Sequence, residues 1–99
     1  AVKILVLNNN FLGMVRQWQE MFFAGRYASA EMKNPDFVAI AKAYQIASER
    51  VSLRKYLKNA VEAMIATDGP YFLEVIVERE DNVFPMVPTG ASVSEIRLK

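Results

Sequence analysis

The feature that most constrains the fold is an apolar, β-branched run at the start of the chain, Val2–Leu7. Lys3 is its only polar residue, so a strand formed here presents apolar side chains on both faces. Such strands are typical of parallel sheets that helices cover on both sides, whereas the strands of a half-exposed sheet alternate apolar and polar residues. We therefore predict a buried parallel strand over residues 2–7, with a neighbouring strand on each side.

Helical and extended patterns alternate along the rest of the chain. Apolar residues spaced three or four apart predict helices over residues 12–23, 36–45 and 53–67. A second apolar run predicts a strand over residues 71–77, and a weaker pattern allows a short strand over residues 46–51.

Residues that are typical of helix ends support these limits. The triplet Asn34–Asp36 suits the start of the second helix, because Asn caps, Pro fits the first turn and Asp complements the positive end of the helix dipole. Ser52 is the expected cap of the third helix. Residues 68–70, Asp-Gly-Pro, end that helix, since Gly accommodates the turn after it and Pro cannot continue it.

Strands that alternate with helices predict the α/β class, here a partial three-layer parallel sheet with flanking helices, in the order β-α-α-(β)-α-β-tail. We assign residues 1–82 to this domain. Residues 83–99 form a C-terminal arm, because Pro85, Pro88 and Gly90 favour extended chain, with a short helical turn expected near its end. The sheet is small and the chain begins within a strand, without a Met. We therefore expect a piece of a longer protein that exposes sheet edge or apolar helix surface and self-associates.

Composition argues against several classes of function. Twelve Lys and Arg against 11 Asp and Glu give a net charge of +1, whereas nucleic-acid binding needs a basic excess. The chain has neither His nor Cys, which removes the commonest general base, the usual zinc ligands and a thiol nucleophile. No apolar run approaches the roughly 20 residues of a membrane helix, and no signal-peptide pattern is present. A cytoplasmic location without a membrane partner is therefore expected.

The turn after the first strand is the main candidate binding site. In open α/β sheets, ligands bind where the carboxyl end of a strand leads into a helix, and residues 8–13, Asn-Asn-Asn-Phe-Leu-Gly, occupy such a junction. The helix N-terminus suits a phosphate, and an Asn side-chain oxygen suits Mg²⁺ or Ca²⁺. No carboxylate lies between Ala1 and Gln19, so at most half of a metal site is present. On these residues alone, a plain capped turn remains the alternative.

Other side chains admit both a structural and a functional interpretation. Met14 and Trp18 share a helix face, which favours a core position over the wall of a pocket. Arg16 and Gln17 are expected on the solvated face of that helix. Glu74 is the only charge in the last strand, and we expect it at a sheet edge or paired with a Lys, without a catalytic role. A solvated helix face is expected for the basic residues Arg50, Arg54, Lys55 and Lys58.

Three motifs closely resemble the catalytic subunit of the acetohydroxyacid (acetolactate) synthase family. The first is Leu7–Glu20, LNNNFLGMVRQWQE, and the others are Asn34–Phe37 and Asn82–Pro88, in the same order as in that family. The resemblance extends over essentially all 99 residues and implies the last part of a C-terminal thiamine-diphosphate-binding domain. Its most specific element is the Gly-Met-Val-Arg-Gln-Trp-Gln run, since the Asn-Asn pair is common to a wider superfamily.

The resemblance implies an enzyme that condenses two 2-ketoacids. Pyruvate is decarboxylated and joined to a second pyruvate or to 2-ketobutyrate, in the biosynthesis of branched-chain amino acids. The implied cofactors are thiamine diphosphate and Mg²⁺, with FAD in the full-length parent. Because the cofactor carries the difficult chemistry, a chain that lacks His and Cys is compatible with this activity.

The resemblance also implies roles for residues of the strand–helix junction. The side-chain oxygen of Asn9 and the backbone carbonyl of Phe11 correspond to Mg²⁺ ligands. Leu12, Gly13 and Met14 correspond to residues that lie against the diphosphate and the thiazolium ring.

Further along the helix, the resemblance implies a substrate pocket. Met14, Val15 and Trp18 correspond to its lining, and the Trp favours 2-ketobutyrate as the second substrate. The segment Val83–Pro88 corresponds to the beginning of an arm that folds over the active site.

Several parts of the implied enzyme are not found among the 99 residues. These are a Gly-Asp-Gly motif that supplies an Asp ligand, a glutamate contributed by the partner subunit, and the FAD-binding domain. We therefore expect the isolated chain to be inactive. Its implied partners are the rest of its own subunit, a homo-oligomer partner and a regulatory small subunit. The alternative is a small, non-catalytic α/β module for binding or assembly.

Overall fold

A computed structural model describes residues 1–99 and confirms the α/β class. Its elements, in chain order, are β1 (Lys3–Asn8), α1 (Gly13–Phe22), α2 (Phe37–Ala43), β2 (Ala47–Val51), α3 (Arg54–Ala66), β3 (Tyr71–Ile76) and the 3₁₀-helix η1 (Val93–Glu95). The three strands form one parallel sheet in the order β1-β3-β2. The weak strand expected over residues 46–51 is therefore present, and it pairs with β3 from Ala47 to Val51.

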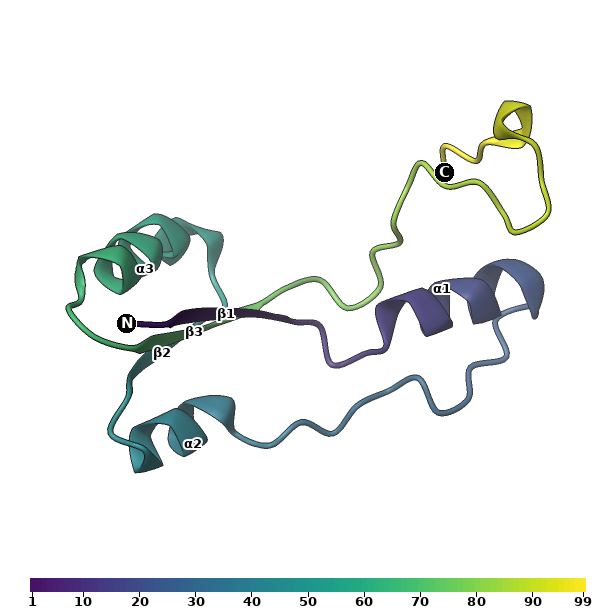
Figure 1. Ribbon diagram of the computed structural model, residues 1–99. Coiled ribbons are helices and arrows are strands. Elements are labelled where there is room, and N and C mark those ends of the chain that lie inside the picture. The colour runs from purple at the N-terminus through teal and green to yellow at the C-terminus, as the bar shows by residue number, and fades with distance from the viewer.

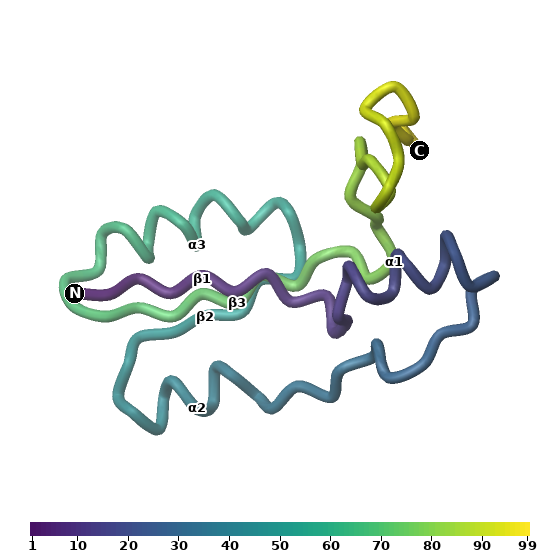
Figure 2. Tube along the Cα trace, turned by 45° about the vertical axis from the view of Figure 1, so that its right-hand side comes forward, coloured from purple at the N-terminus to yellow at the C-terminus, as the bar shows by residue number.

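A helix lies on each face of this sheet. Figure 1 and Figure 2 show α3 on one face and α2 on the other, so the predicted three-layer arrangement is present around β3. The main core lies between α3 and the sheet. Its buried members are Val51, Ala60, Tyr71, Leu73 and Val75.

The first strand is not buried, and the prediction for it is wrong in this respect. β1 pairs with β3 on one edge only, and Ile4, Leu5 and Leu7 are 44%, 45% and 64% exposed. The physical reason is that the chain supplies one neighbouring strand where the apolar pattern suits two, and α1 runs away from the sheet instead of covering β1 (Figure 1). The buried central strand is β3.

Two expected helix caps also differ in the structure. Asp36, not Asn34, is the N-cap of α2, and its side chain accepts a hydrogen bond of 3.0 Å from the Ala39 N–H. Ser52 does not cap α3, whose N-cap position is Leu53 without a side-chain hydrogen bond. The Asn34 side chain instead donates hydrogen bonds to Asn8 and Asn10 in the turn after β1.

The arm formed by residues 83–99 lies beside α1, at the end of the molecule away from α2 and α3 (Figure 1). Its expected helical turn is η1, which begins with a capping box between Ser92 and Glu95. Met86 and Arg97 form an antiparallel bridge that closes the arm on itself. The longest dimension is 48 Å and the radius of gyration is 17.3 Å, against about 13 Å for a compact domain of this length. None of the helices is both long and apolar enough to cross a bilayer.

Candidate functional site

The turn after β1 is built from two overlapping side-chain-to-backbone hydrogen bonds. Asn8 Oδ1 accepts from the Asn10 N–H at 2.9 Å, and Asn9 Oδ1 accepts from the Phe11 N–H at 3.1 Å. Asn10 has a φ of 57°, in the left-handed region that Asn tolerates better than most residues. Backbone hydrogen bonds from Leu12 to Ala30 and from Met32 to Asn10, both 2.8 Å, tie the turn to the segment before α2.

Several backbone groups at this turn have no hydrogen-bond partner in the chain. They are the carbonyl oxygen of Phe11 and the N–H groups of residues 13–15 in the first turn of α1. The N-cap residue Leu12 offers no side-chain cap, so the positive end of the helix is left open. Free amides at a helix N-terminus bind anions, and a free carbonyl oxygen is a ligand for a hard cation.

Gly13 allows α1 to begin directly against the Asn9 side chain. A Cβ placed on Gly13 would lie 3.3 Å from Asn9 Nδ2, which is tighter than ordinary van der Waals contact. A larger residue would therefore displace the Asn9 carboxamide or the helix start. The glycine keeps the Asn9 side chain and the free amides of residues 13–15 next to one another.

These groups fit a divalent cation bound together with a diphosphate, but only in part. Asn9 Oδ1 and the Phe11 carbonyl are neutral oxygen donors of the kind that Mg²⁺ accepts. No group of three or more acidic side chains in the chain is placed to hold a metal ion, and the first acid after β1 is Glu20. The negative charge that balances the cation would have to come from the diphosphate and from a carboxylate outside these residues.

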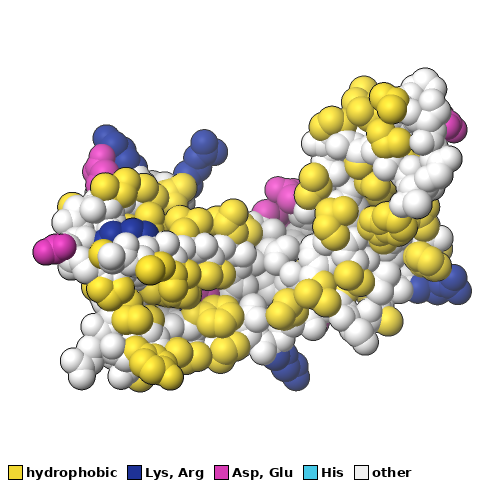
Figure 3. Space-filling view, in the orientation of Figure 1, with side chains coloured by type: hydrophobic (Ala, Val, Ile, Leu, Met, Phe, Trp, Pro, Cys, Tyr) yellow, Lys and Arg dark blue, Asp and Glu magenta, His cyan; other side chains and the backbone are white.

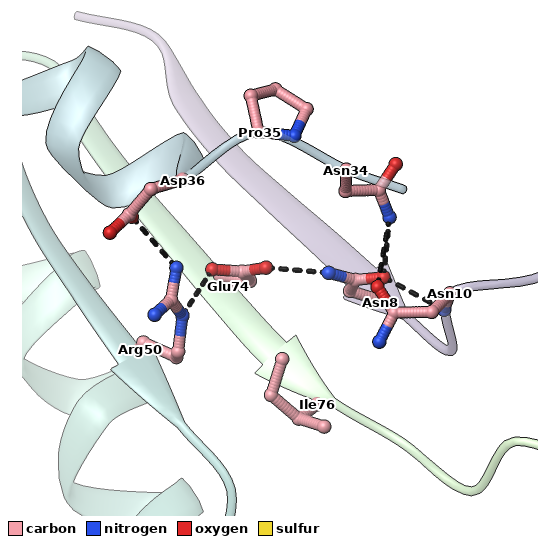
Figure 4. A pocket seen from close by; sticks show the side chains of 8 residues that line it. All are labelled: Asn8, Asn10, Asn34, Pro35, Asp36, Arg50, Glu74 and Ile76. Carbon is pink, nitrogen blue, oxygen red and sulfur yellow. Dashed lines mark hydrogen bonds and ion pairs between the residues drawn. The ribbon is translucent and has the colours of Figure 1, made fainter. Parts of the chain in front are cut away.

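A polar pocket of about 340 Å³ opens beside the turn, at the carboxyl ends of the strands (Figure 4). At its centre lies Glu74 of β3, which is 2% exposed. Glu74 accepts from Asn8 Nδ2 at 2.7 Å with one carboxylate oxygen and from Arg50 Nε at 2.6 Å with the other. Its lining residues are Asn8, Asn10, Asn34, Pro35, Asp36, Arg50, Glu74 and Ile76.

The expectations for Glu74 and Arg50 are both wrong. Glu74 lies on the central strand, not at a sheet edge, and its partner is an Arg, not a Lys. Arg50 belongs to β2, directly opposite Glu74, and not to a solvated helix face. The one charge in an otherwise apolar strand was the available signal. What periodicity could not show was that β2 and β1 would place donors on its two sides.

Arg50 links this pocket to the start of α2. Its Nη2 donates to Asp36 Oδ1 at 2.8 Å. The Ala39 backbone N–H and the Arg50 guanidinium hold the pKa of the Asp36 carboxyl below its ordinary value. The hydrogen bond and charge of Glu74 raise the pKa of Arg50, so this guanidinium remains charged.

Helix α1 has its buried and exposed faces the other way round from the sequence-based expectation. Arg16 and Gln17 are 7% and 1% exposed, whereas Met14, Val15 and Trp18 are 50%, 45% and 37% exposed. The polar pair is therefore not solvated, and the apolar stripe is not part of the core of this chain. The reason is that the segments packed against α1 within the chain offer aromatic rings, carboxylates and backbone polar groups, which are partners for Arg16 and Gln17.

Arg16 is buried by rings and carboxylates. Its guanidinium carbon lies 4.7 Å from the centre of the Tyr27 ring and 5.6 Å from that of Phe11. It also pairs with Glu20 at 2.9 Å and with Glu80 at 3.7 Å. This arrangement is a structural clamp, because every charged group in it is paired.

Gln17 binds the backbone at the start of the arm from both sides. Its Nε2 donates to the Val83 carbonyl at 3.0 Å, and its Oε1 accepts from the Val83 N–H at 2.9 Å. Gln17 Nε2 also contacts the Met86 sulfur at 3.2 Å. The arm is thus attached to the helix whose first turn carries the open amides.

The three residues expected to line a substrate pocket do lie together. Met14, Val15 and Trp18 border one hollow on the exposed face of α1, and Trp18 also borders a second one with Pro88 and Thr89 of the arm. Figure 3 shows hydrophobic side chains exposed at this end of the molecule as well as over the sheet and its helices. The structure therefore brings the expected metal, diphosphate and pocket residues onto one turn and the helix that follows it.

Comparison with known proteins gives a family match and several named relatives. Residues 1–75 match the model of the thiamine pyrophosphate enzyme family, C-terminal TPP binding domain, where thiamine pyrophosphate is another name for thiamine diphosphate. The chain is 43% identical over 99 residues to the acetolactate synthase isozyme 2 large subunit of Escherichia coli, covering 99% of the chain and 18% of that protein. It is 46% identical over 95 residues to the mitochondrial acetolactate synthase catalytic subunit of Aspergillus candidus, covering 96% of the chain and 14% of that protein.

The acetolactate synthase large subunit of Cyanidium caldarium is 42% identical over 97 residues, with 96% of the chain and 17% of that protein covered. The chain thus spans less than a fifth of the length of these relatives. The family match includes the whole sheet up to Val75, the turn after β1 and helix α1. The chain therefore belongs to the family of thiamine pyrophosphate enzymes, as part of their C-terminal cofactor-binding domain.

Proposed function

We propose that this chain is the C-terminal part of the cofactor-binding domain of an acetolactate synthase catalytic subunit. The whole protein would condense two 2-ketoacids, pyruvate with pyruvate or with 2-ketobutyrate, in branched-chain amino-acid biosynthesis. The observation that carries this proposal is 43% identity over 99 residues to a subunit whose name states the activity. The open oxygen and N–H groups at the β1–α1 junction support it, because they suit a metal-bound diphosphate.

In this proposal, Asn9 Oδ1 and the Phe11 carbonyl oxygen hold Mg²⁺. The Phe11 oxygen has no competing hydrogen bond, and Asn9 Oδ1 has one, from the Phe11 N–H. A carbonyl or carboxamide oxygen has two lone pairs, so Asn9 Oδ1 retains one for a cation. Leu12, Gly13 and Met14 lie against the diphosphate, which the free amides at the start of α1 bind by hydrogen bonds and by the helix dipole.

Thiamine diphosphate, when bound, supplies the electron sink that allows one 2-ketoacid to lose its carboxylate and join to another. The residues of this chain bind and orient that group. Met14, Val15 and Trp18 form an apolar wall one turn further along α1, which would contact the substrate and exclude water. We further propose that residues 1–82 are the domain part and residues 83–99 an arm that closes over this wall, since Pro88 and Thr89 already border Trp18.

The rest of the site and of the assembly would come from outside these residues. A carboxylate ligand for Mg²⁺ would precede β1 in the full-length subunit, and a glutamate that activates the cofactor would come from a homo-oligomer partner. FAD would be held by another domain, and a regulatory small subunit is a further proposed partner. We propose a cytoplasmic location, although the relative from Aspergillus candidus is named as mitochondrial. The isolated chain would be inactive.

The proposal is tested by assaying the full-length protein that contains this segment. It should form acetolactate from pyruvate only when both thiamine diphosphate and Mg²⁺ are present. With pyruvate and 2-ketobutyrate in competition, Trp18→Leu should shift the product ratio away from 2-ketobutyrate, because a large aromatic surface is lost from the pocket. Tyr56→Leu is the matched control, since Tyr56 is an exposed aromatic residue on α3. No acetolactate from the wild type, or the same product ratio in Trp18→Leu, would contradict the proposal.

A further inference from the structure

Glu74 is a buried carboxylate for which the proposed function has no use. It is one of the three largest fully buried side chains, with Leu73 and Gln17, and it lies in the middle of the central strand. A carboxylate in a sheet interior is costly to desolvate and is retained only where hydrogen bonds and an opposite charge compensate it. The two contacts of the Glu74 carboxylate, with Asn8 and with Arg50, therefore indicate what its role is.

One of these contacts leads towards the proposed metal site. Figure 4 shows Glu74 between Arg50 on one side and Asn8 on the other. The 2.7 Å hydrogen bond from Asn8 Nδ2 fixes which end of the Asn8 carboxamide faces the strand. The other end, Oδ1, must then face the turn, because a carboxamide has its donor and its acceptor on opposite sides.

The Asn8 oxygen holds the turn in place. It accepts from the Asn10 N–H at 2.9 Å and from Asn34 Nδ2, also at 2.9 Å. Asn9 lies between Asn8 and Asn10, so the direction of its side chain depends on the conformation of both neighbours. Without the Glu74 contact, the Asn8 carboxamide could turn over and present a donor to the Asn10 N–H, which would open the turn.

We propose that Glu74 is a positioning residue for the metal site, which acts through Asn8 to hold the Asn9 carboxamide towards the cation. This inference rests on the proposed function, because it requires Asn9 to be a ligand. Hydrogen-bond partners behind the direct ligands of a metal typically change its affinity by about 10- to 100-fold. Glu74 contacts Asn8 and not the proposed ligand Asn9, so we expect an effect at the lower end of this range.

The competing explanation is that Glu74 merely stabilises the sheet through Arg50. The two carboxylate oxygens separate these explanations, because Oε1 contacts Asn8 and Oε2 contacts Arg50. Substitutions can therefore remove either contact. A purely structural role predicts that metal affinity follows the loss of stability, whichever contact is broken.

The experiment measures Mn²⁺ binding in the full-length protein that contains this segment, with saturating thiamine diphosphate. Free Mn²⁺ is followed by its paramagnetic resonance signal, so no catalytic activity is needed. Glu74→Met retains the length of the side chain but replaces the carboxylate with a thioether sulfur, which is only a weak acceptor for Asn8, and we expect Mn²⁺ to bind about 10-fold more weakly. Asn8→Ala removes this contact together with the two that Asn8 Oδ1 makes to the turn, and it tests the link through Asn8 if Glu74→Met does not fold.

A control variant retains the Asn8 contact. Arg50→Gln leaves Glu74 itself in place while removing the charge of its other partner. We expect Arg50→Gln to bind Mn²⁺ within about twofold of the wild type even where its melting temperature falls, since the Asn8 acceptor is intact. Equal weakening in Glu74→Met and Arg50→Gln, or wild-type affinity in Glu74→Met or Asn8→Ala, would overturn the role of Glu74.

Asn9→Ala separates failure of this inference from failure of the proposed function. If Asn9→Ala leaves Mn²⁺ binding unchanged, the metal site itself is wrongly placed and the proposed function fails. If Asn9→Ala weakens Mn²⁺ binding while Glu74→Met does not, only the positioning role fails.

Discussion

At the scale of single residues, the fold depends on buried polar side chains that are fully hydrogen-bonded. Asn8, Gln17 and Glu74 are 7%, 1% and 2% exposed, and no buried side-chain nitrogen or oxygen in the chain lacks a partner. Each of the three joins segments that are far apart in sequence. Removing one partner of such a contact leaves a desolvated polar group, which typically costs about 1–3 kcal/mol.

Loss of the Gln17 hydrogen bonds should have a local effect on the arm. Gln17→Met retains the side-chain volume but removes both hydrogen bonds to Val83, so residues 83–99 should exchange their amide hydrogens faster. Hydrogen–deuterium exchange with mass spectrometry measures this directly.

Gln19→Met is the matched control for that variant. Gln19 binds the Ala28 carbonyl and N–H in the same two-sided way, at 2.8 and 3.1 Å, but in an exposed position. It should accelerate exchange near Ala28 and leave the arm unchanged. Unaltered exchange of the arm in Gln17→Met would show that Gln17 does not hold it.

At the scale of helices and strands, periodicity in the sequence predicted the elements better than their surroundings. All three helices and all three strands lie within a few residues of their predicted positions, because these depend on local patterns. The burial predicted for β1 and for the apolar face of α1 was wrong, since both are exposed in this chain. An apolar pattern indicates that a surface is suited to burial, but it does not show which part of which chain covers it. The motif resemblance predicts site roles for Asn9, Phe11 and Trp18, which stay predictions, whereas the pocket residues Asn34 and Arg50 were missed because their contacts cross between elements.

Tyr71, the first residue of β3, gives an alkaline prediction for the sheet. Burial, and after it the nearby Glu49 carboxylate, raise the pKa of Tyr71 above 10.0. Since the folded state favours the protonated phenol, its contribution to stability is complete below the pKa of the unfolded chain and is lost as the pH rises through the higher folded pKa.

The Tyr71→Phe variant should be less stable than the wild type near neutral pH. This difference in the free energy of unfolding should become smaller at alkaline pH. Near neutrality the variant loses only the 3.3 Å hydrogen bond to Glu49. Above about pH 10 the wild type must unfold or ionise a buried phenol, whereas the variant has none there. Urea unfolding curves at both pH values measure the difference, and a gap that does not change with pH would contradict the assignment.

At the scale of the whole molecule, the chain is extended and leaves apolar surface uncovered. The radius of gyration of 17.3 Å and the open edge of β1 leave apolar surface on two separate regions, the sheet edge and the outer face of α1. Unpaired strand edges associate with other strands unless charge or proline prevents it. The same regions are those that a larger domain would cover.

The isolated chain should therefore self-associate through β1. Leu7→Lys places a charge on the open strand, where Leu7 is 64% exposed, and should yield monomers with the same helix and strand content. Ile65→Lys, at a 69% exposed position on α3, is the control and should leave association unchanged. Sedimentation equilibrium gives the mass of each. A wild-type chain that sediments as a monomer would contradict self-association through the open edge of β1.

We propose, above all, that the turn after β1 carries one half of a metal–diphosphate site. Its most direct test is isothermal titration of thiamine diphosphate, in saturating Mg²⁺, into the full-length protein and its Asn9→Ala variant. Removal of a ligand should weaken cofactor binding at least as much as removal of an outer hydrogen-bond partner, by about 10-fold or more. Equal affinity in the two proteins would mean that Asn9 is only a turn residue, and that the cofactor is bound elsewhere.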